Sequence, residues 1–278
     1  GFETALGLVW GRSVDLESAS GGQPLEIAGL AVANRPGFGE EAFFEADSVR
    51  LSFRPWTLVY RGFDKLEITR PRLSLMVDGE GKANYDDLRG SGVRRFLLPV
   101  ERIRFTDGQV RFEDRAEKTA WLADGVGWRT TFLPTDGGVT AAGWFKVGRM
   151  RWPSDLRQNQ GVDSLNVEHR LTVLSSGAFS GRLSQLRGSA RYDAHRVGIY
   201  HNVWGTVRFE ETGFVVESAQ CVVYDGELDL KGQVDYLEDR LAVKGTVEIA
   251  DMPAERLLTE GLKLKLPLSG QVEMTVTM

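Results

Sequence analysis

The feature that most constrains this chain is the regular alternation of apolar and polar side chains. It is clearest from Leu25 to Pro55 and from Lys65 to Leu88, where short alternating runs are separated by segments that contain Gly or Pro. Alternation at a period of two residues places every second side chain on the same face of a β-strand, so that one face is buried and the other is hydrated. The sequence therefore predicts a sheet protein.

The composition agrees with many strands joined by many turns. The 278 residues are 42% apolar and include 32 glycines and nine prolines, which do not suit a helical bundle. We predict an all-β fold with an elongated, curved, mostly antiparallel sheet built of repeated hairpins, either open as a groove or closed as a sandwich. One to three short helices are expected, at residues 251–261, at residues 85–88 and at residues 2–9.

An internal repeat organises the first half of the chain. The stretch from Lys65 to Asp78 resembles the stretch from Arg102 to Arg115, which lies 37 residues further on. Each copy is predicted to be a hairpin, with its turn at Arg70-Pro71 or Asp107-Gly108, and the apolar residues of both copies should face one surface. The equivalent positions are Leu66 and Ile103, Ile68 and Phe105, Thr69 and Thr106, Leu73 and Val110, and Leu75 and Phe112.

Asp-Gly pairs predict further turns, because both residues tolerate the backbone conformations of tight turns. Alternation is almost unbroken between Val203 and Ile249, which predicts a run of strands in the second half of the chain. The polar segment from Trp152 to Asn166 contains Gly and Pro and predicts a boundary between two sheet segments, residues 1–152 and 153–278. The predicted Asp-Gly turns are Asp78-Gly79, Asp124-Gly125, Asp136-Gly137 and Asp225-Gly226.

Four motifs in order carry a resemblance to a known family. They are Gly-Leu-hydrophobic-Val-x-Asn-x-Pro-Gly-Phe (Gly29 to Phe38), Ala-x-x-Val-x-Leu (Ala46 to Leu51), Leu-x-Ile-x-x-Pro-x-Leu-x-Leu (Leu66 to Leu75) and Gly-x-x-Asn-Tyr (Gly81 to Tyr85). Together they resemble the amino-terminal region of the AsmA-like family, and residues 203–249 resemble its carboxy-terminal region. In that second region Tyr224-Asp225-Gly226 stands where the family has Tyr-Gly-Gly.

The resemblance has clear implications for the location and class of the protein. AsmA-like proteins belong to the envelope of Gram-negative bacteria and are related to bridge-like lipid transfer proteins. We therefore expect a periplasmic protein tied to the inner membrane by an amino-terminal anchor that precedes the matched region, with two AsmA-like β segments at 1–152 and 153–278.

The sequence offers little for catalysis. It has no Gly-x-Ser-x-Gly elbow and no phosphate-binding loop, and its three histidines, His169, His195 and His201, lack the spacing of a zinc site and are interpreted as solvent-facing strand residues. The single Cys221 excludes an internal disulfide and is interpreted as a small apolar strand residue. A net charge of −5 argues against a nucleic-acid partner. We expect no enzyme activity, no cofactor and no metal.

The expected function is non-enzymatic binding or transport of phospholipid between the inner and outer membranes, on an apolar β-groove. Two alternatives stay open: a scaffold that helps outer-membrane protein biogenesis by pairing with a client strand, and a closed β-sandwich that binds carbohydrate or a protein partner, such as another envelope protein. The candidate lining for acyl chains is Leu66, Ile68, Leu73, Leu75, Ile103, Phe105, Val110, Phe112, Val207, Phe209, Leu228 and Leu230.

Tryptophans are concentrated in one stretch, with Trp121, Trp128, Trp144 and Trp152 close together in the sequence. They either fill the junction between two packed sheets or line the lipid groove. Two others, Trp10 and Trp56, are candidates for contact with a membrane surface.

Overall fold

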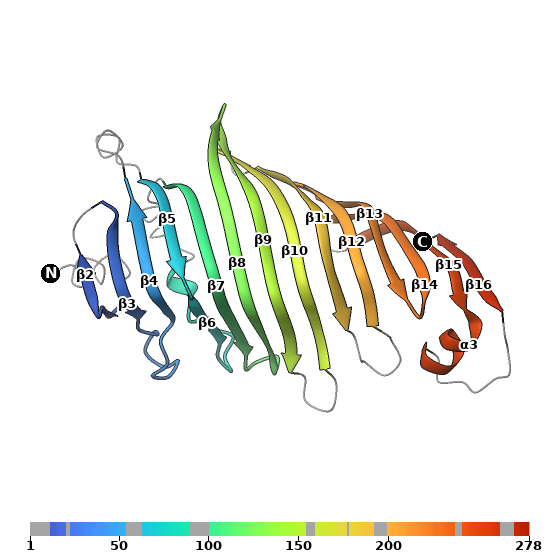
Figure 1. Cartoon of the computed structure of the whole chain (residues 1–278), viewed down its shortest axis with the longest axis horizontal. Helices are drawn as coiled ribbons and strands as arrows, with labels where there is room; N and C mark the ends of the chain where they lie inside the picture. The colour runs from blue at the N-terminus through green and yellow to red at the C-terminus, as the bar shows by residue number, and fades with distance from the viewer. Residues whose placement is uncertain are drawn as a thin grey trace. The chain divides into compact units, whose positions relative to one another are not determined.

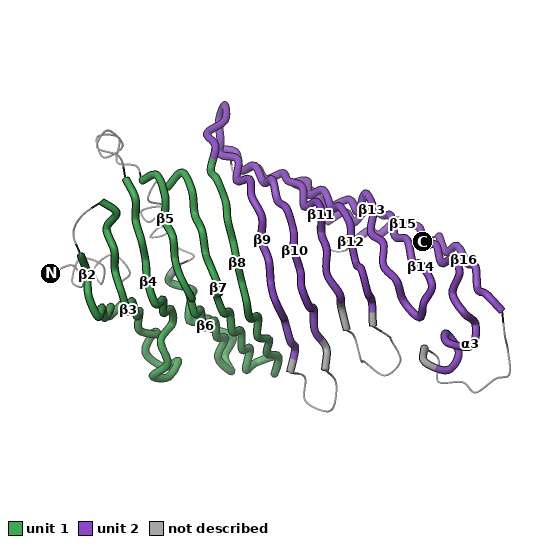
Figure 2. Tube along the Cα trace, viewed as in Figure 1, with its two compact units in different colours: residues 1–132 green, residues 133–278 purple. Residues whose placement is uncertain are grey.

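The computed structural model describes residues 12–20, 23–53, 63–88, 100–153, 159–176, 178–191, 199–236, 241–261 and 270–277. Strands make up most of these residues, and the only helices among them are a 3₁₀ turn η1 (Asp86–Leu88), one turn of α-helix α3 (Ala254–Arg256) and a π-helical turn η3 (Leu257–Gly261) (Figure 1). The predicted all-β, mostly antiparallel fold is confirmed. The chain divides into two compact units, residues 1–132 and 133–278 (Figure 2).

Unit 1 is a sheet of mixed direction. Along the sheet the order is β1-β3-β4-β5-β7-β8, with β2 added to β3 and with β6 beside β4 and β7. Neighbouring strands are antiparallel except that β5 and β6 both pair parallel with β7. The strands are β1 (Val14–Asp15), β2 (Ser18–Ser20), β3 (Leu25–Val32), β4 (Phe44–Ser52), β5 (Phe63–Thr69), β6 (Arg72–Val77), β7 (Val100–Asp114) and β8 (Thr119–Thr135).

The 37-residue repeat is present in the register of these parallel pairs. Leu66 pairs with Ile103 in β5 and β7, and Leu73 pairs with Val110 in β6 and β7, so each residue of the first copy lies beside its equivalent in the second. The equivalence is confirmed, but the prediction that each copy is a hairpin is wrong. Among the described residues β5 and β6 follow one another along the same side of β7, and β7 itself is continuous.

The residues that were predicted to reverse the chain only bend it. Arg70 has φ of 48° and Asp107 has φ of 56°, and each is followed directly by extended backbone in the same direction. A left-handed residue within a ladder produces a bulge, which kinks a strand and leaves its direction unchanged. Gly108 lies at this kink because a Cβ there would come within 3.0 Å of the Pro71 ring of the neighbouring copy.

Unit 2 is an antiparallel meander in which each strand pairs with the next along the chain (Figure 1). This antiparallel order agrees with the predicted repeated hairpins, except that the helical segment 254–261 lies between β15 and β16. The segment from Trp152 to Asn166 lies within this unit and joins β9 to β10, and the expected boundary of the family-like segments at residues 152/153 stays a prediction. The strands are β9 (Gly138–Pro153), β10 (Asn159–Leu174), β11 (Phe179–Arg191), β12 (Ile199–Glu210), β13 (Gly213–Val223), β14 (Gly226–Tyr236), β15 (Leu241–Pro253) and β16 (Gln271–Thr277).

Three of the four predicted Asp-Gly turns are found. Asp78 begins a turn in which its carboxylate accepts hydrogen bonds from the backbone of residues 80 and 82, and Asp136-Gly137 joins β8 to β9. The turn before Gly226 is formed by Tyr224 and Asp225, whose φ values of 51° and 61° are those of a two-residue hairpin turn. The prediction for Asp124-Gly125 is wrong, because this pair forms a bulge inside β8.

The predicted carboxy-terminal helix exists but begins later than expected. Asp251 belongs to β15 and has φ of 54°, and the helical segment begins at Ala254 without a side-chain cap. The expected turn near residue 85 is confirmed as η1, and the expected helix at 2–9 lies outside the described residues. In the part of the chain that the structure describes, no helix combines the length and the apolar character needed to cross a bilayer.

Candidate functional site

Two aromatic pairs mark the apolar face of unit 1. Phe105 of β7 lies directly opposite Trp128 of β8, with ring centroids 5.2 Å apart and the rings edge to face. Phe112 lies opposite Trp121, and their rings stack with centroids 5.5 Å apart. Each pair contributes about 0.5–1.5 kcal/mol beyond the burial of its area.

The two pairs lie on the same face although bulges separate them. Directly paired residues share a face, and residues two apart on a regular strand also do. Gly108 pairs with Val126, which is two residues from Trp128, and Val110 and Phe112 follow Gly108 at intervals of two. The bulge in β7 and the bulge in β8 therefore cancel, and the apolar face continues across the kink.

All eight candidate residues of unit 1 share this face, as the period-two rule predicted. The parallel register extends it from β7 to β5 and β6. Ile68 is buried and the other seven are half-buried, while Arg104 and Arg111 on the opposite face are exposed. The eight are Leu66, Ile68, Leu73, Leu75, Ile103, Phe105, Val110 and Phe112.

The four candidate residues of unit 2 also share one face. Val207 and Phe209 of β12 pair with Val216 and Phe214 of β13, which in turn pair with alternate residues of β14 on the side of Leu228 and Leu230. An aromatic row crosses four strands on this face, with neighbouring ring centroids 6.1–6.4 Å apart. The row consists of Phe179, Phe209, Phe214 and Tyr236.

Many large apolar side chains on this face of unit 2 are open to solvent. Val173, Tyr236 and Val243 are 50%, 52% and 54% exposed. The described part of unit 2 consists of strands β9 to β16 and the helical segment at 254–261, so it supplies no second sheet to cover the face. We call the following residues the open apolar face: Val139, Val173, Phe179, Phe209, Phe214, Tyr236, Val243, Met274 and Val276.

The other face of unit 2 is polar. Arg182 forms an ion pair with Glu217, and Gln220 donates a hydrogen bond of 2.8 Å to Asp229 on the neighbouring strand β14. An exposed ion pair such as Arg182–Glu217 contributes little to stability, about 0–1 kcal/mol. Unit 2 is thus an amphipathic sheet whose polar face carries cross-strand ion pairs and hydrogen bonds.

Two ionisable groups lie on the apolar side of unit 2. His169 pairs with Gly143 and Leu183, is 9% exposed, and has its pKa lowered by burial. The interpretation of all three histidines as solvent-facing is therefore wrong for His169, because the glycine opposite leaves room for its ring; His201 is exposed and His195 lies outside the described residues. Burial, and then the nearby Asp229 carboxylate, raise the pKa of the Cys221 thiol.

The tryptophans do not fill a junction between packed sheets. Trp121 and Trp128 are half-buried on the apolar face of unit 1, where they contact phenylalanines. Trp144 is half-buried and paired with Glu168, and the Lys146 ammonium lies 6.0 Å from its ring centroid. Trp152 is half-buried in β9, while Trp10 and Trp56 lie outside the described residues.

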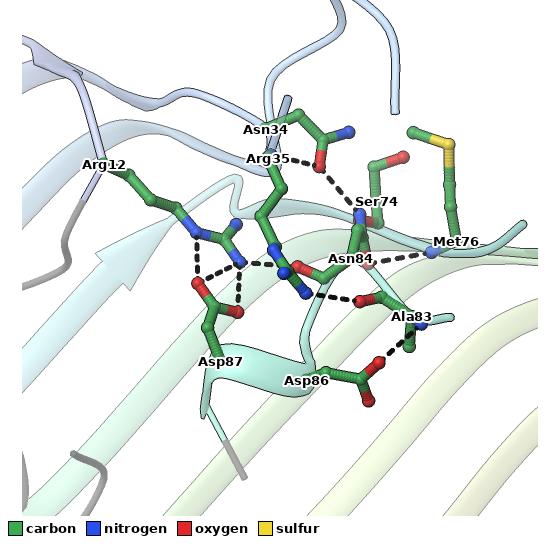
Figure 3. A network of polar contacts seen from close by, with 9 residues as sticks. All are labelled: Arg12, Asn34, Arg35, Ser74, Met76, Ala83, Asn84, Asp86 and Asp87. Carbon is green, nitrogen blue, oxygen red and sulfur yellow. Dashed lines mark hydrogen bonds and ion pairs between the residues drawn. The ribbon is translucent and has the colours of Figure 1, made fainter. Parts of the chain in front are cut away.

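A buried polar network in unit 1 escaped the sequence analysis (Figure 3). The guanidinium of Arg12 donates hydrogen bonds of 2.7–3.1 Å to the Asp87 carboxylate and a further one to the backbone oxygen of Asn84. The same guanidinium lies 4.1 Å from the centroid of the Phe43 ring. Arg12 and Asp87 are 75 positions apart and show no pattern that could have paired them.

Asn84 lies at the centre of this network and is completely buried (Figure 3). Its side-chain amide donates to the backbone oxygen of Ser74 and to Asn34 Oδ1, at 2.9 and 3.0 Å, and its oxygen accepts from the backbone of Met76. Asn34 and Asn84 come from the first and last of the four motifs that carry the family resemblance. The contact gives those motifs a structural role: they hold two loops together.

No site for metal chemistry emerges from the described residues, in which no three or more His, Cys, Asp or Glu side chains are grouped to bind an ion. Comparison with protein-family models finds no match to the chain, and comparison with curated proteins finds none either. The two apolar faces and the polar network are therefore interpreted from their geometry alone.

Proposed function

We propose that this chain is a non-enzymatic lipid-binding protein that carries or organises phospholipid between the two membranes of a bacterial envelope. The observation that carries the proposal is the open apolar face of unit 2, on which large apolar side chains of β9, β10, β11, β14, β15 and β16 are exposed. Contiguous exposed apolar surface of this kind marks a binding surface.

The energetics favour acyl chains as the occupant. Moving a sixteen-carbon chain from a membrane into water costs on the order of 12 kcal/mol, at about 0.8 kcal/mol per methylene. The aromatic row and the valines beside it offer apolar contact, and the Tyr236 hydroxyl is the one polar group of the row. A charged headgroup would stay in water at the margin of the face, where it costs nothing to solvate.

The location belongs to the proposal as well. We place the protein in the periplasm, anchored to the inner membrane by a segment that precedes the described residues, because four motifs resemble the AsmA-like family.

Two adjacent residues of β11 provide a matched test. Phe179 belongs to the open apolar face and is 37% exposed, whereas Ser180 is exposed on the opposite face. We expect Phe179→Asp to lower the amount of co-purified or photo-crosslinked phospholipid several-fold, because it places a charge where an acyl chain lies. Ser180→Asp introduces the same charge and should retain the lipid.

Thermal melting accompanies both measurements. Phe179 is only partly buried, so we expect the melting temperatures of both variants to stay close to that of the parent. A folded Phe179→Asp protein that retains as much lipid as the Ser180→Asp protein would exclude this face as the lipid site.

A scaffold function is the second candidate, and strand β16 favours it. Among the described residues β16 pairs only with β15, and its Met274 and Val276 are 46% and 38% exposed. A strand with one open edge can accept a client strand through backbone hydrogen bonds. Site-specific crosslinking from residue 275 to an outer-membrane protein, in place of lipid, would support this function over the first.

A further inference from the structure

Three neighbouring strands of unit 2 carry an irregularity at the same level. Ser164 in β10, Gln185 in β11 and Asn202 in β12 have φ values of 55°, 49° and 50°. The strand pairings shift in register next to each of them. Residues other than glycine rarely adopt this conformation, and aligned bulges re-aim side chains and often lie beside binding sites.

These bulges surround a concavity of about 790 Å³. It opens on the polar face. Gly205 pairs with Leu186 and with Ala219 on the apolar side of the sheet. Trp204 and Arg187, which pair with each other, are the next residues along their strands and therefore point to the polar side. The lining residues are Ser164, Ser184, Gln185, Arg187, Gly188, Ser189, His201, Asn202, Val203, Trp204, Gly205 and Thr206.

Three side chains of the lining are available to a ligand. Trp204 is 46% exposed, although it lies on the polar face, and Arg187 and His201 are exposed as well. In the described part of the chain Arg187 has no ion-pair partner, which sets it apart from Arg182 and Arg208, both of which pair with Glu217. An open indole ring beside a free cation combines a flat apolar surface with a positive charge.

The chemistry of the lining restricts the ligand. The twelve lining residues include no carboxylate, so the concavity does not suit a cation, and they include four hydroxyl and two amide side chains, so it does not suit a purely apolar molecule. The concavity lies on the polar face of the sheet. The headgroup of a lipid bound to the open apolar face therefore does not reach the concavity.

We propose that this concavity is a binding site for an acidic saccharide, a pyranose ring that carries a phosphate or carboxylate group. The apolar C–H side of the ring would stack on the Trp204 indole, and the anionic group would lie at Arg187 and His201. Ring hydroxyls would exchange hydrogen bonds with Ser184, Ser189 and Thr206. The site is independent of the proposed lipid function.

Titration with glucose 6-phosphate tests the site, with glucose alone and inorganic phosphate alone as the two partial probes. Binding is followed by calorimetry and by the change in tryptophan fluorescence. We expect saturable binding of glucose 6-phosphate that is at least tenfold tighter than that of either partial probe. Trp204→Ala and Arg187→Gln should each weaken it at least tenfold.

Arg170→Gln is the control, because Arg170 is an exposed arginine of β10 outside the lining. It should bind glucose 6-phosphate like the parent, and circular dichroism should find all three variants folded, since the substituted side chains are exposed. Absence of binding at millimolar glucose 6-phosphate, or equal binding by the parent and both lining variants, would overturn the proposal. If inorganic phosphate binds as tightly as glucose 6-phosphate, and Trp204→Ala leaves both affinities unchanged, the site binds an anion and the saccharide part of the proposal is wrong.

Discussion

Asn84 acts as a substitute for a neighbouring strand at the edge of β6. Its side-chain amide bonds the backbone of Ser74 and Met76, and its own backbone N–H donates to the Met76 oxygen at 2.8 Å. Buried backbone groups need partners wherever a ladder ends, and a short amide side chain supplies them with little loss of conformational entropy. These hydrogen bonds explain the Asn of the Gly-x-x-Asn-Tyr motif.

Removal of this amide should be costly. We expect Asn84→Ala to lower the free energy of unfolding by about 2–4 kcal/mol, because it leaves several buried backbone groups without partners. Asn166→Ala is the control: its amide is exposed and donates to the Ser164 backbone oxygen, so its loss should change stability by less than about 0.5 kcal/mol. Urea denaturation of both variants measures the loss of free energy of unfolding. Equal losses would show that the buried hydrogen bonds of Asn84 do not stabilise the fold more than the exposed one of Asn166.

His169 makes stability depend on pH. Its folded-state pKa lies below the ordinary value of 6.5, so the unfolded chain takes up a proton first as the pH falls. The contribution of neutral His169 to the free energy of unfolding is fully present above pH 6.5, and it declines as the pH drops from there towards the folded-state pKa. We expect His169→Leu to flatten the pH dependence of the melting temperature between pH 7.5 and pH 5.5. An unchanged slope in His169→Leu would contradict this.

At the scale of elements, sequence reasoning found the faces of the strands better than their ends. Alternation placed Leu66, Phe105 and Phe112 on one face because the period of two follows directly from strand geometry. The prediction of turns at Asp107-Gly108 and Asp124-Gly125 is wrong, because Asp and Gly are common both in hairpin turns and in bulges. Only the pairing with the neighbouring strand decides which of the two forms. The Arg12–Asp87 pair could not be predicted, since the two residues meet only through the tertiary fold.

Two glycines in turns allow the cost of a strained backbone to be measured apart from the cost of a steric clash. A Cβ added at Gly137 or Gly79 would meet nothing within 4 Å, but only Gly137 has positive φ, at 80°. We expect Gly137→Ala to destabilise the protein by about 1 kcal/mol, and Gly79→Ala to be neutral or stabilising by up to about 1 kcal/mol, because alanine restricts the unfolded chain. Thermal melting of the pair checks this, and a similar loss in both would rule out conformational strain as the cause.

At the scale of the whole molecule, each unit is an amphipathic sheet described by the same rule. Apolar residues occupy one face and cross-strand ion pairs occupy the other, and the bulges are arranged so that neither face is interrupted. A closed sandwich would bury its apolar face against a second sheet. The open apolar face of unit 2 instead leaves side chains such as Val243 more than half exposed.

The single cysteine reports on that face. Cys221 pairs with Leu228 on the apolar side, and its raised pKa favours the unreactive thiol, so maleimide labelling at neutral pH should be slow. We expect phospholipid vesicles to slow it several-fold further. In a Cys221→Ser background, Ser180→Cys should label at the same rate with and without vesicles; equal slowing at both positions would indicate general occlusion.

The in-register repeat also bears on how such a chain changes length during evolution. Because Leu66 lies beside Ile103 and Leu73 beside Val110, a duplicated gene segment of this period would add a copy whose apolar side chains already match those of its neighbour. Neighbouring strands lie about 4.8 Å apart, so each added strand would widen the apolar surface by that step. Growth by tandem duplication therefore preserves the apolar face, whereas a shift of the pairing register by one residue would turn every side chain of the new strand to the wrong side.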